Sequence, residues 1–332
     1  MRRFLLIVVC LFLISCVRNT SEKNVPADDI NQTSFNEVNA ANVADTMDAA
    51  GYVDRARRNL SNEQISSAMK DINSALSLDK KNIEALLVLA DIYYALGDED
   101  NILLTLNKAT ECAPLDSRPI VKLSELSFLQ GNAQMSNAYI DKALELDRYN
   151  PRAYFMRGMI SLSANDTANA IKNFMTSRMQ QDDFVDPIIQ LAHLYAVKGD
   201  TLAKAFYKEA INVAPEDYAL CYDYAMYLQD NGFPEEAMAY YDKLIEMMPD
   251  VFDFVYNKAY IYLVYYGDNQ KALEYFDKAL EIDPSSENAL FNKGRVYEEM
   301  GDYINAKSIY LQILRKNPDY QLAIDAINRI GQ

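Results

Sequence analysis

The sequence predicts an all-α protein built as a solenoid of stacked helix pairs. Its prolines recur at a nearly constant interval: the steps from Pro215 to Pro249, Pro284 and Pro318 are 34, 35 and 34 residues, and three similar steps fit between Pro114 and Pro215. Small and bulky residues keep the same phase in every interval, and turn-forming pairs fall between the prolines. Such a period is typical of repeats that bury their apolar faces only by stacking on their neighbours.

Each repeat is expected to contain two antiparallel helices. If the proline is position 32 of a repeat, position 8 is small in all eight copies, which are Ala56, Ala90, Ser124, Gly158, Ala192, Ala225, Ala259 and Gly294. A mostly small position 20 and a bulky position 24 lie about one helical turn apart, as in Ala237 and Tyr241. Small residues let helix axes approach closely, and bulky residues fill the remaining space.

The predicted turns between the two helices carry residues that favour the left-handed conformation at a helix C-terminus. These turns are Gly97-Asp98, Gly131-Asn132, Asn165-Asp166, Gly199-Asp200, Asn231-Gly232, Gly267-Asp268 and Gly301-Asp302. The fifth repeat is one residue short and the seventh is one residue long. We expect both changes to lie in the turn between the helices.

The segment from Asn288 to Pro318 carries Leu290, Gly294, Tyr297, Gly301-Asp302-Tyr303, Ala306 and Tyr310, and residues 272–284 read ALEYFDKALEIDP. At these residues the chain resembles the tetratricopeptide repeat (TPR) family, and the resemblance extends over residues 49–320. It implies a right-handed α-α superhelical solenoid in which the first helix of each repeat lines a concave groove. Such a groove is expected to bind other proteins or peptides.

The expected domain boundaries follow from the repeat phase. The eight repeats span 49–82, 83–116, 117–150, 151–184, 185–217, 218–251, 252–286 and 287–320, and a capping helix spans 321–332. The first repeat is weak because Arg55 and Asn59 stand where the family prefers apolar residues. The capping helix is expected to pack through Leu322, Ala323, Ala326, Ile327 and Ile330.

Residues 1–15 are interpreted as a lipoprotein signal peptide. The chain begins with two arginines, and the apolar run from Phe4 to Ile14 is too short to span a bilayer comfortably. Leu13-Ile14-Ser15-Cys16 resembles a bacterial lipobox, which implies cleavage before Cys16 and attachment of lipid, palmitate included, to that cysteine. By resemblance to other bacterial lipoproteins, Val17 rather than Asp in the next position implies the outer membrane of a double-membraned bacterium, facing the periplasm. An ordinary signal peptide with an incidental cysteine and a short membrane anchor are the alternatives.

Residues 16–48 are expected to form the lipidated cysteine and a flexible tether. The segment is rich in Asn, Asp, Ser and Thr and shows no apolar periodicity, which is typical of chains that do not fold alone. The tether would let the repeats reach partners at a distance from the membrane.

The charge of the chain argues against nucleic acid as a partner. Loss of Arg2 and Arg3 with the signal peptide leaves 30 basic against 48 acidic side chains, a balance of −18. A chain with this charge repels phosphate backbones, and no basic stripe interrupts it.

No catalytic, metal or cofactor site is expected. His193 is the only histidine, so a zinc site or a Ser/His or Cys/His catalytic pair would have to be built around it, and no ligand-spaced cysteine or second histidine is available. A structural or groove-lining role is expected for His193. The acidic doublets Asp182-Asp183, Glu235-Glu236 and Glu298-Glu299 fall near predicted turns or helix ends, where solvated carboxylates are usual. Cys112 and Cys221 lie four repeats apart and are expected to remain unbridged.

The predicted partner-binding site is the groove lined by the first helices. Transferring the groove-facing positions of the family gives an aromatic and methionine-bearing surface, namely Tyr94, Phe128, Phe155, Met159, His193, Tyr222, Met226, Tyr256, Tyr260 and Phe291. Of 24 tyrosines, 16 lie at or after Tyr218, which favours repeats six to eight as the site. Packing against the neighbouring helix is the competing explanation for each residue. Position 5 is apolar or aromatic throughout, so a carboxylate clamp based on a lysine there is disfavoured.

These observations predict a non-catalytic, membrane-anchored scaffold of the cell envelope. Its expected partners are other envelope proteins or peptides, and its membrane contact is the lipid at Cys16. A glycan- or polysaccharide-binding module is the alternative, because aromatic side chains also stack on sugars.

Overall fold

The computed structural model describes residues 47–331, and this part of the chain is entirely helical. It contains 17 α-helices and one π-helix, with no β-strand among the described residues. The all-α solenoid predicted from the sequence is therefore confirmed. The chain divides into two compact units, Met1–Gln181 and Asp182–Gln332, which we call the N-terminal block and the C-terminal block.

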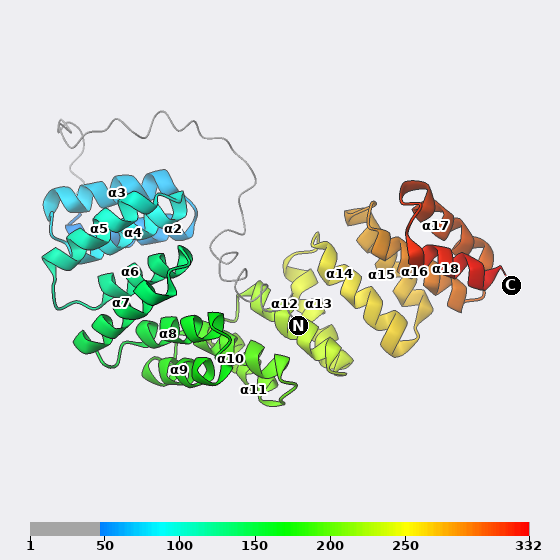
Figure 1. Cartoon of the computed structure of the whole chain (residues 1–332). Helices are drawn as coiled ribbons and strands as arrows, with labels where there is room; N and C mark the ends of the chain where they lie inside the picture. The colour runs from blue at the N-terminus through cyan, green and yellow to red at the C-terminus, as the bar shows by residue number, and fades with distance from the viewer. Residues whose placement is uncertain (1–46, 332) are drawn as a thin grey trace, which may run out of the picture. The chain divides into compact units, whose positions relative to one another are not determined.

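The helices alternate between a first and a second helix of each repeat (Figure 1). The N-terminal block holds α2 (Ala49–Ser61), α3 (Ile65–Leu78), α4 (Ile83–Leu96), α5 (Glu99–Cys112), α6 (Arg118–Leu129), α7 (Ala133–Leu146), α8 (Pro151–Ser163) and α9 (Thr167–Gln180). The C-terminal block holds α10 (Val185–Val197), α11 (Leu202–Val213), α12 (Tyr218–Asp230), α13 (Pro234–Met247), α14 (Phe252–Ile261), the π-helix η2 (Tyr262–Tyr266), α15 (Asn269–Ile282), α16 (Glu287–Glu299), α17 (Tyr303–Lys316) and α18 (Gln321–Ile330).

The core of each block lies where the two helices of a repeat meet. Every position-8, position-20 and position-24 residue is buried, as illustrated by Ala259, Ala272 and Phe276, each with no exposed surface. The small residues bring the paired helices together, and the large residue from the second helix covers the contact. The periodicity of the sequence is thus the periodicity of the core.

Two repeats carry glycine at the closest point of this contact. A Cβ atom on Gly158 would lie 2.5 Å from the ring of Phe174, and a Cβ atom on Gly294 would overlap the ring of Tyr310 in the same way. Real Cβ atoms do not approach other atoms this closely, so the aromatic ring occupies the space that a methyl group would need.

One repeat replaces the small apolar pair with two serines. Ser124 and Ser136 are fully buried, their hydroxyl oxygens are 2.8 Å apart, and the Ser136 hydroxyl is 3.0 Å from the Ser124 carbonyl oxygen. The two polar groups satisfy each other, which removes most of the cost of burying them.

The turns within repeats follow the predicted chemistry. Gly97, Gly131, Gly199, Gly232, Gly267 and Gly301 all have positive φ angles, and Asn165 takes the same role with φ of 61°. The next residue is often an Asp or Asn whose side chain accepts a hydrogen bond from the backbone three residues later, as Asp98 does from Asn101. In the short fifth repeat, Asp200 instead accepts from Leu202, only two residues on, so the missing residue lies at the start of α11.

The weak first repeat forms the same helix pair with a polar contact in place of an apolar one. Asp71 of α3 is 5% exposed and accepts hydrogen bonds from Arg55 (2.6 and 2.9 Å) and Asn59 (2.9 Å) of α2. Arg55 and Asn59, which depart from the family pattern, therefore both bind the buried Asp71.

The extra residue of the seventh repeat lies in a helix and not in the turn, so our expectation for its position was wrong. Residues Tyr262–Tyr266 form the π-helix that ends the first helix of this repeat. The backbone N–H of Asp268 reaches back to the carbonyl of Tyr262, six residues away, whereas Asp302 bonds Tyr297, five residues away. A helix absorbs one inserted residue as a π-turn while the flanking helices keep their packing.

Helix α18 covers the last repeat of the C-terminal block. Ala323 and Ala326 are fully buried, and Ile327 and Ile330 pack against the same cluster. Leu322 is 55% exposed, so its predicted place on the packed face was wrong. Successive residues of a helix point in directions about 100° apart, so Leu322 lies at the edge of the face that Ala323 and Ala326 bury.

Cys112 and Cys221 are free thiols, and the predicted signal peptide, Cys16 and most of the predicted tether lie outside the described residues. Cys221 is buried, which raises the pKa of its thiol. Between residues 47 and 331 we find no helix with the length and apolar character of a membrane span.

The close approach at Gly294 leads to a stability prediction. An alanine there gains about 1 kcal/mol of helix propensity, but forcing a methyl group into a filled core costs about 1–3 kcal/mol. We expect Gly294→Ala to lower the free energy of unfolding by up to about 2 kcal/mol, measured by urea unfolding. In a Tyr310→Leu background the ring is absent, and the same substitution should become stabilising. An equal effect of Gly294→Ala in both backgrounds would contradict this explanation.

Candidate protein-binding face

The first helices of neighbouring repeats pack directly on one another. In the N-terminal block α2 contacts α4 and α6 contacts α8, and in the C-terminal block α16 contacts α18. The side chains of successive first helices therefore form one surface in each block, which we call the first-helix face. The candidate binding residues lie on these helices.

In the N-terminal block, two of the four candidate residues are buried in the core. Phe155 and Met159 are each 2% exposed, and the Phe155 ring lies 5.6 Å from that of Phe174. Tyr94 and Phe128 are half-buried, and the Tyr94 hydroxyl donates a hydrogen bond to the Lys122 carbonyl. Phe155 and Met159 thus pack between helices and offer almost no surface to a partner.

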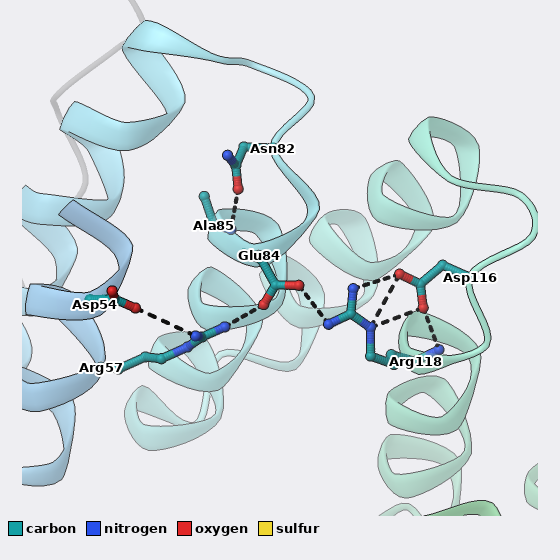
Figure 2. A network of polar contacts seen from close by, with 7 residues as sticks. All are labelled: Asp54, Arg57, Asn82, Glu84, Ala85, Asp116 and Arg118. Atoms are coloured by element: carbon teal, nitrogen blue, oxygen red, sulfur yellow. Dashed lines mark hydrogen bonds and ion pairs between the residues drawn. The ribbon is translucent and has the colours of Figure 1, made fainter. Parts of the chain in front are cut away.

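Ion pairs between repeats occupy much of the first-helix face of the N-terminal block. Lys122 binds Asp91 of the preceding repeat, and Arg152 Nε lies 2.7 Å from Glu125 Oε1. Figure 2 shows the most extended group, in which Glu84 of α4 binds Arg57 of α2 and Arg118 of α6. The charges on this surface are largely satisfied by one another.

The carboxylate of Glu84 forms ion pairs with side chains of the repeats before and after its own. Partial burial raises its pKa, but hydrogen bonds from Arg118 and Arg57 outweigh that effect and hold the pKa below its usual value. Arg118 also binds Asp116 at 2.7 Å and lowers the pKa of that carboxyl. Asn82 caps the same helix by accepting from the Ala85 backbone (Figure 2).

In the C-terminal block the contacts that link α12 to α14 and α14 to α16 at the candidate residues are uncharged. Asn257 of α14 donates a 3.0 Å hydrogen bond to the Tyr222 hydroxyl of α12, and its amide nitrogen lies 3.3 Å from Met226 Sδ. The Tyr241 hydroxyl also lies 3.2 Å from Met226 Sδ and 3.2 Å from Gln229 Oε1. The candidate residues Tyr222 and Met226 are thereby held in place by the next repeat.

The same pattern recurs one repeat later. The Asn292 side chain of α16 donates a 2.8 Å hydrogen bond to the Tyr256 hydroxyl of α14, and Arg295 donates to the side-chain oxygen Oδ1 of Asn292 at 3.0 Å. The Phe291 ring contacts Tyr310 and Tyr320, with centroids 5.6 and 6.0 Å apart. Tyr256 and Phe291 are half-buried, so each keeps part of its ring exposed on this face.

Tyr260 and His193 complete the candidate residues. Tyr260 is half-buried on α14. His193 lies on α10 with Nε2 3.5 Å from the Asp223 carboxylate and its ring against Tyr207, while its Nδ1 is buried with no hydrogen-bond partner among the described residues. It is held between aromatic and acidic neighbours.

Burial raises the pKa of Tyr222 and Tyr256 further above neutral pH. Desolvation, followed by the negative charge of Asp253, raises the pKa of Tyr222 to about 12. Desolvation also raises the pKa of Tyr256 above its ordinary value. The phenols therefore act as neutral hydrogen-bonding groups beside apolar rings, a combination common in protein interfaces.

Sequence reasoning missed the two asparagines that hold these tyrosines. Asn257 and Asn292 occupy position 6 of consecutive repeats and are 7% and 6% exposed. The sequence does show an asparagine at the same position of two consecutive repeats. It does not show which side chain each asparagine binds, since that depends on how one repeat stacks on the next.

In residues 47–331 no group of three or more His, Cys, Asp or Glu side chains is placed to hold a metal ion. Of the acidic doublets, Glu298 binds Arg329 at 2.6 and 2.9 Å, and Glu236 binds Lys204 at 2.5 Å. These carboxylates serve in ion pairs between helices.

Two sequence models described as tetratricopeptide repeat match residues 222–287 and 263–327. A TPR repeat-containing protein of Methanocaldococcus jannaschii is 24% identical over 199 residues, which are 56% of this chain and 34% of that protein. The chain thus spans about a third of this relative. Residues 222–327 thus match the tetratricopeptide repeat.

Solved structures of low sequence identity share the fold. The Cut9-Hcn1 hetero-tetramer of the APC/C aligns with a TM-score of 0.53 at 12% identity, covering 85% of this chain and 55% of that one. PilF of Pseudomonas aeruginosa aligns with a TM-score of 0.50 at 16% identity, covering 64% of this chain and 97% of that one. Tetratricopeptide repeats generally form non-catalytic scaffolds for protein–protein interaction, and the fold of this chain is suited to that role.

The Glu84 group leads to a pH prediction. Because folding lowers the pKa of Glu84, its ion pairs stabilise the fold at neutral pH, and this stabilisation is lost as the pH falls through the lowered pKa. The pairs are half-exposed, so we expect Glu84→Gln to cost no more than about 1 kcal/mol at pH 7. The difference from the native protein should vanish in acid and shrink in high salt, as measured by chemical denaturation. Glu111→Gln, which alters an exposed carboxylate on α5, should have no such effect.

Proposed function

We propose that this protein is a lipid-anchored, non-catalytic scaffold that binds partner proteins through the first-helix face of its C-terminal block. The observation that carries the proposal is the row of half-buried aromatic residues on α12, α14 and α16, namely Tyr222, Tyr256, Tyr260 and Phe291. Tyrosine and phenylalanine in this state offer contact area with few rotamers to immobilise, which suits them to anchor a bound polypeptide.

The two blocks offer different surfaces to a partner. The N-terminal block uses the charged side chains of its first-helix face for ion pairs between its own repeats. The C-terminal block instead fixes its tyrosines through neutral asparagines, which leaves the ring faces partly exposed and the geometry rigid. A pre-organised surface loses little conformational entropy on binding, which favours the C-terminal block as the partner site.

The anchor is part of the same proposal and rests on the sequence before the repeats. A basic start, a short apolar run and Leu13-Ile14-Ser15-Cys16 support lipid attachment at Cys16, and Val17 supports the outer membrane facing the periplasm. Envelope proteins or peptides would then be the partners. Anchoring raises the effective concentration of bound partners at the membrane, so moderate affinity for each one is sufficient.

Site-specific photo-cross-linking tests the binding face. We expect the photo-cross-linker p-benzoylphenylalanine at position 260 to capture one or a few envelope proteins in the cells that make this protein, identified by mass spectrometry. The same group at position 149, an exposed tyrosine of the N-terminal block, is the matched control. Capture of the same proteins with equal yield at both positions would contradict the assignment, and capture of glycan alone would support the polysaccharide alternative.

Mass spectrometry of the purified native protein tests the anchor. The mature chain should begin at Cys16 and carry lipid, and it should partition with the membrane fraction. Cys16→Ser should retain the signal peptide or release an unlipidated chain, because serine offers no thiol for the lipid. A native chain that begins elsewhere or lacks lipid would refute the proposal.

A further inference from the structure

Arg295, on the first-helix face of α16, is a partly buried cation with no carboxylate within ion-pair distance in the described chain. Other partly buried cations of this protein have such a partner: Lys122 with Asp91, Arg157 with Asp141, Lys204 with Glu236, Lys258 with Asp242, and Lys293 with Asp277. Removing a guanidinium from water without a counter-charge is unfavourable. The absence of a partner at Arg295 therefore requires an explanation.

The carboxylate of Glu298 is already engaged by other side chains. Glu298 lies one helical turn from Arg295, but its Oε1 accepts from Arg329 at 2.6 Å. Its Oε2 accepts from Arg329 at 2.9 Å and from Tyr310 at 3.0 Å. Arg329 belongs to α18, so these bonds link the covering helix to α16. Arg295 contributes to the lowered pKa of Glu298 through its charge but forms no ion-pair contact with it.

Arg295 makes one hydrogen bond among the described residues, and this bond shows how the side-chain amide of Asn292 is oriented. A guanidinium can only donate, so the Asn292 atom facing it at 3.0 Å must be the carbonyl oxygen. The amide nitrogen of Asn292 then donates to the Tyr256 oxygen at 2.8 Å. Tyr256 accepts this bond, so its own hydroxyl hydrogen remains to be donated, and no acceptor for it is present among the described residues.

An open pocket of about 500 Å³ adjoins Arg295. It is lined by Arg295, Glu298, Glu299, Tyr303, Arg329 and Ile330. Glu299 is exposed to solvent, and the charges of Glu298 and Arg329 offset each other. Of the other two charged lining residues, the half-buried Arg295 and the exposed Glu299, neither forms an ion pair within the described chain.

We propose that Arg295 and Tyr256 bind a carboxylate group of the partner polypeptide, carried by its C-terminus or by an Asp or Glu side chain. The inference rests on the proposed function, since it names the chemistry of the partner at the same face. One side-chain amide, that of Asn292, bonds to both the guanidinium and the phenol, which places these two groups close to each other. The guanidinium supplies charge, and the phenol supplies a directed neutral donor.

The site differs from a clamp built on a lysine at position 5, which this chain lacks. Position 5 is here an aromatic residue, Tyr256, and the cation comes from position 9 of the following repeat. Phe291 and Tyr260 lie on the same helices and offer apolar contact to residues next to the carboxylate. The expected ligand is thus an acidic group flanked by apolar side chains.

A synthetic array of random decapeptides, probed with the full-length protein, tests the proposal. Each peptide is made with a free C-terminus and as the C-terminal amide, and with Asp and Glu either retained or replaced by Asn and Gln. We expect the peptides that bind best to lose about tenfold in affinity when the critical carboxylate becomes an amide, the usual effect of losing one charge-assisted hydrogen-bond site. The two series distinguish a C-terminal from a side-chain carboxylate.

Variants assign the effect to the residues. In Arg295→Gln the preference for carboxylate over amide should disappear, in Arg295→Lys part of it should return, and Tyr256→Phe should weaken carboxylate binding several-fold. Arg58→Gln, an exposed arginine of α2, makes the same charge change and should alter nothing. Thermal unfolding of each variant checks that the fold is intact.

The outcomes separate the two proposals. Peptide binding without any preference for carboxylates, or a preference that survives Arg295→Gln in a folded variant, would overturn this inference and leave the scaffold function standing. Failure to bind any peptide, together with no cross-linked partner from position 260, would overturn both.

Discussion

The structure depends on the close contact between the first and second helix of each repeat. At this contact a small residue from the first helix faces a large residue from the second, and at Gly158 and Gly294 the opposing ring occupies the space of a Cβ atom. Because neither helix can move closer or further without a clash or a cavity, the contact sets the geometry of the whole repeat. The first helices are thereby placed so that their side chains reach those of the next repeat.

Polar contacts between neighbouring first helices repeat with the same geometry but different chemistry. The residue at position 6 of one repeat contacts the residue at position 9 of the preceding repeat. In the N-terminal block Lys122 forms an ion pair with Asp91, and in the C-terminal block the Asn257 amide lies beside the Met226 thioether. One scaffold therefore carries a surface whose charges are satisfied internally and another whose aromatic side chains are held by neutral groups. This difference distinguishes the two blocks as binding surfaces more clearly than the fold does, because the helix pairs themselves are alike.

Departures from the repeat pattern are resolved locally and leave the stacking intact. Arg55 and Asn59 replace apolar residues in the first repeat and bind the buried Asp71. The additional residue of the seventh repeat becomes a π-turn, and one result is that the Tyr265 hydroxyl reaches the Gln229 carbonyl of the preceding repeat at 2.6 Å. A stack whose repeats contact only their neighbours confines such changes, since no distant part of the fold has to adjust.

The sequence by itself determined the helix pairs, the repeat period, the turn residues and the buried small and large positions, because all of these follow from contacts within about 30 residues of chain. It also indicated which helices carry the aromatic residues of the candidate face. It did not separate the residues that remain exposed there from those, such as Phe155 and Met159, that the neighbouring helices bury. Only the tertiary structure decided that Asn257 and Asn292 hold Tyr222 and Tyr256, and that Glu298 binds Arg329 and leaves Arg295 unpaired. The physical reason is that burial and pairing depend on how one repeat is rotated and displaced on the next, and that geometry is set by the sum of many side-chain contacts between repeats.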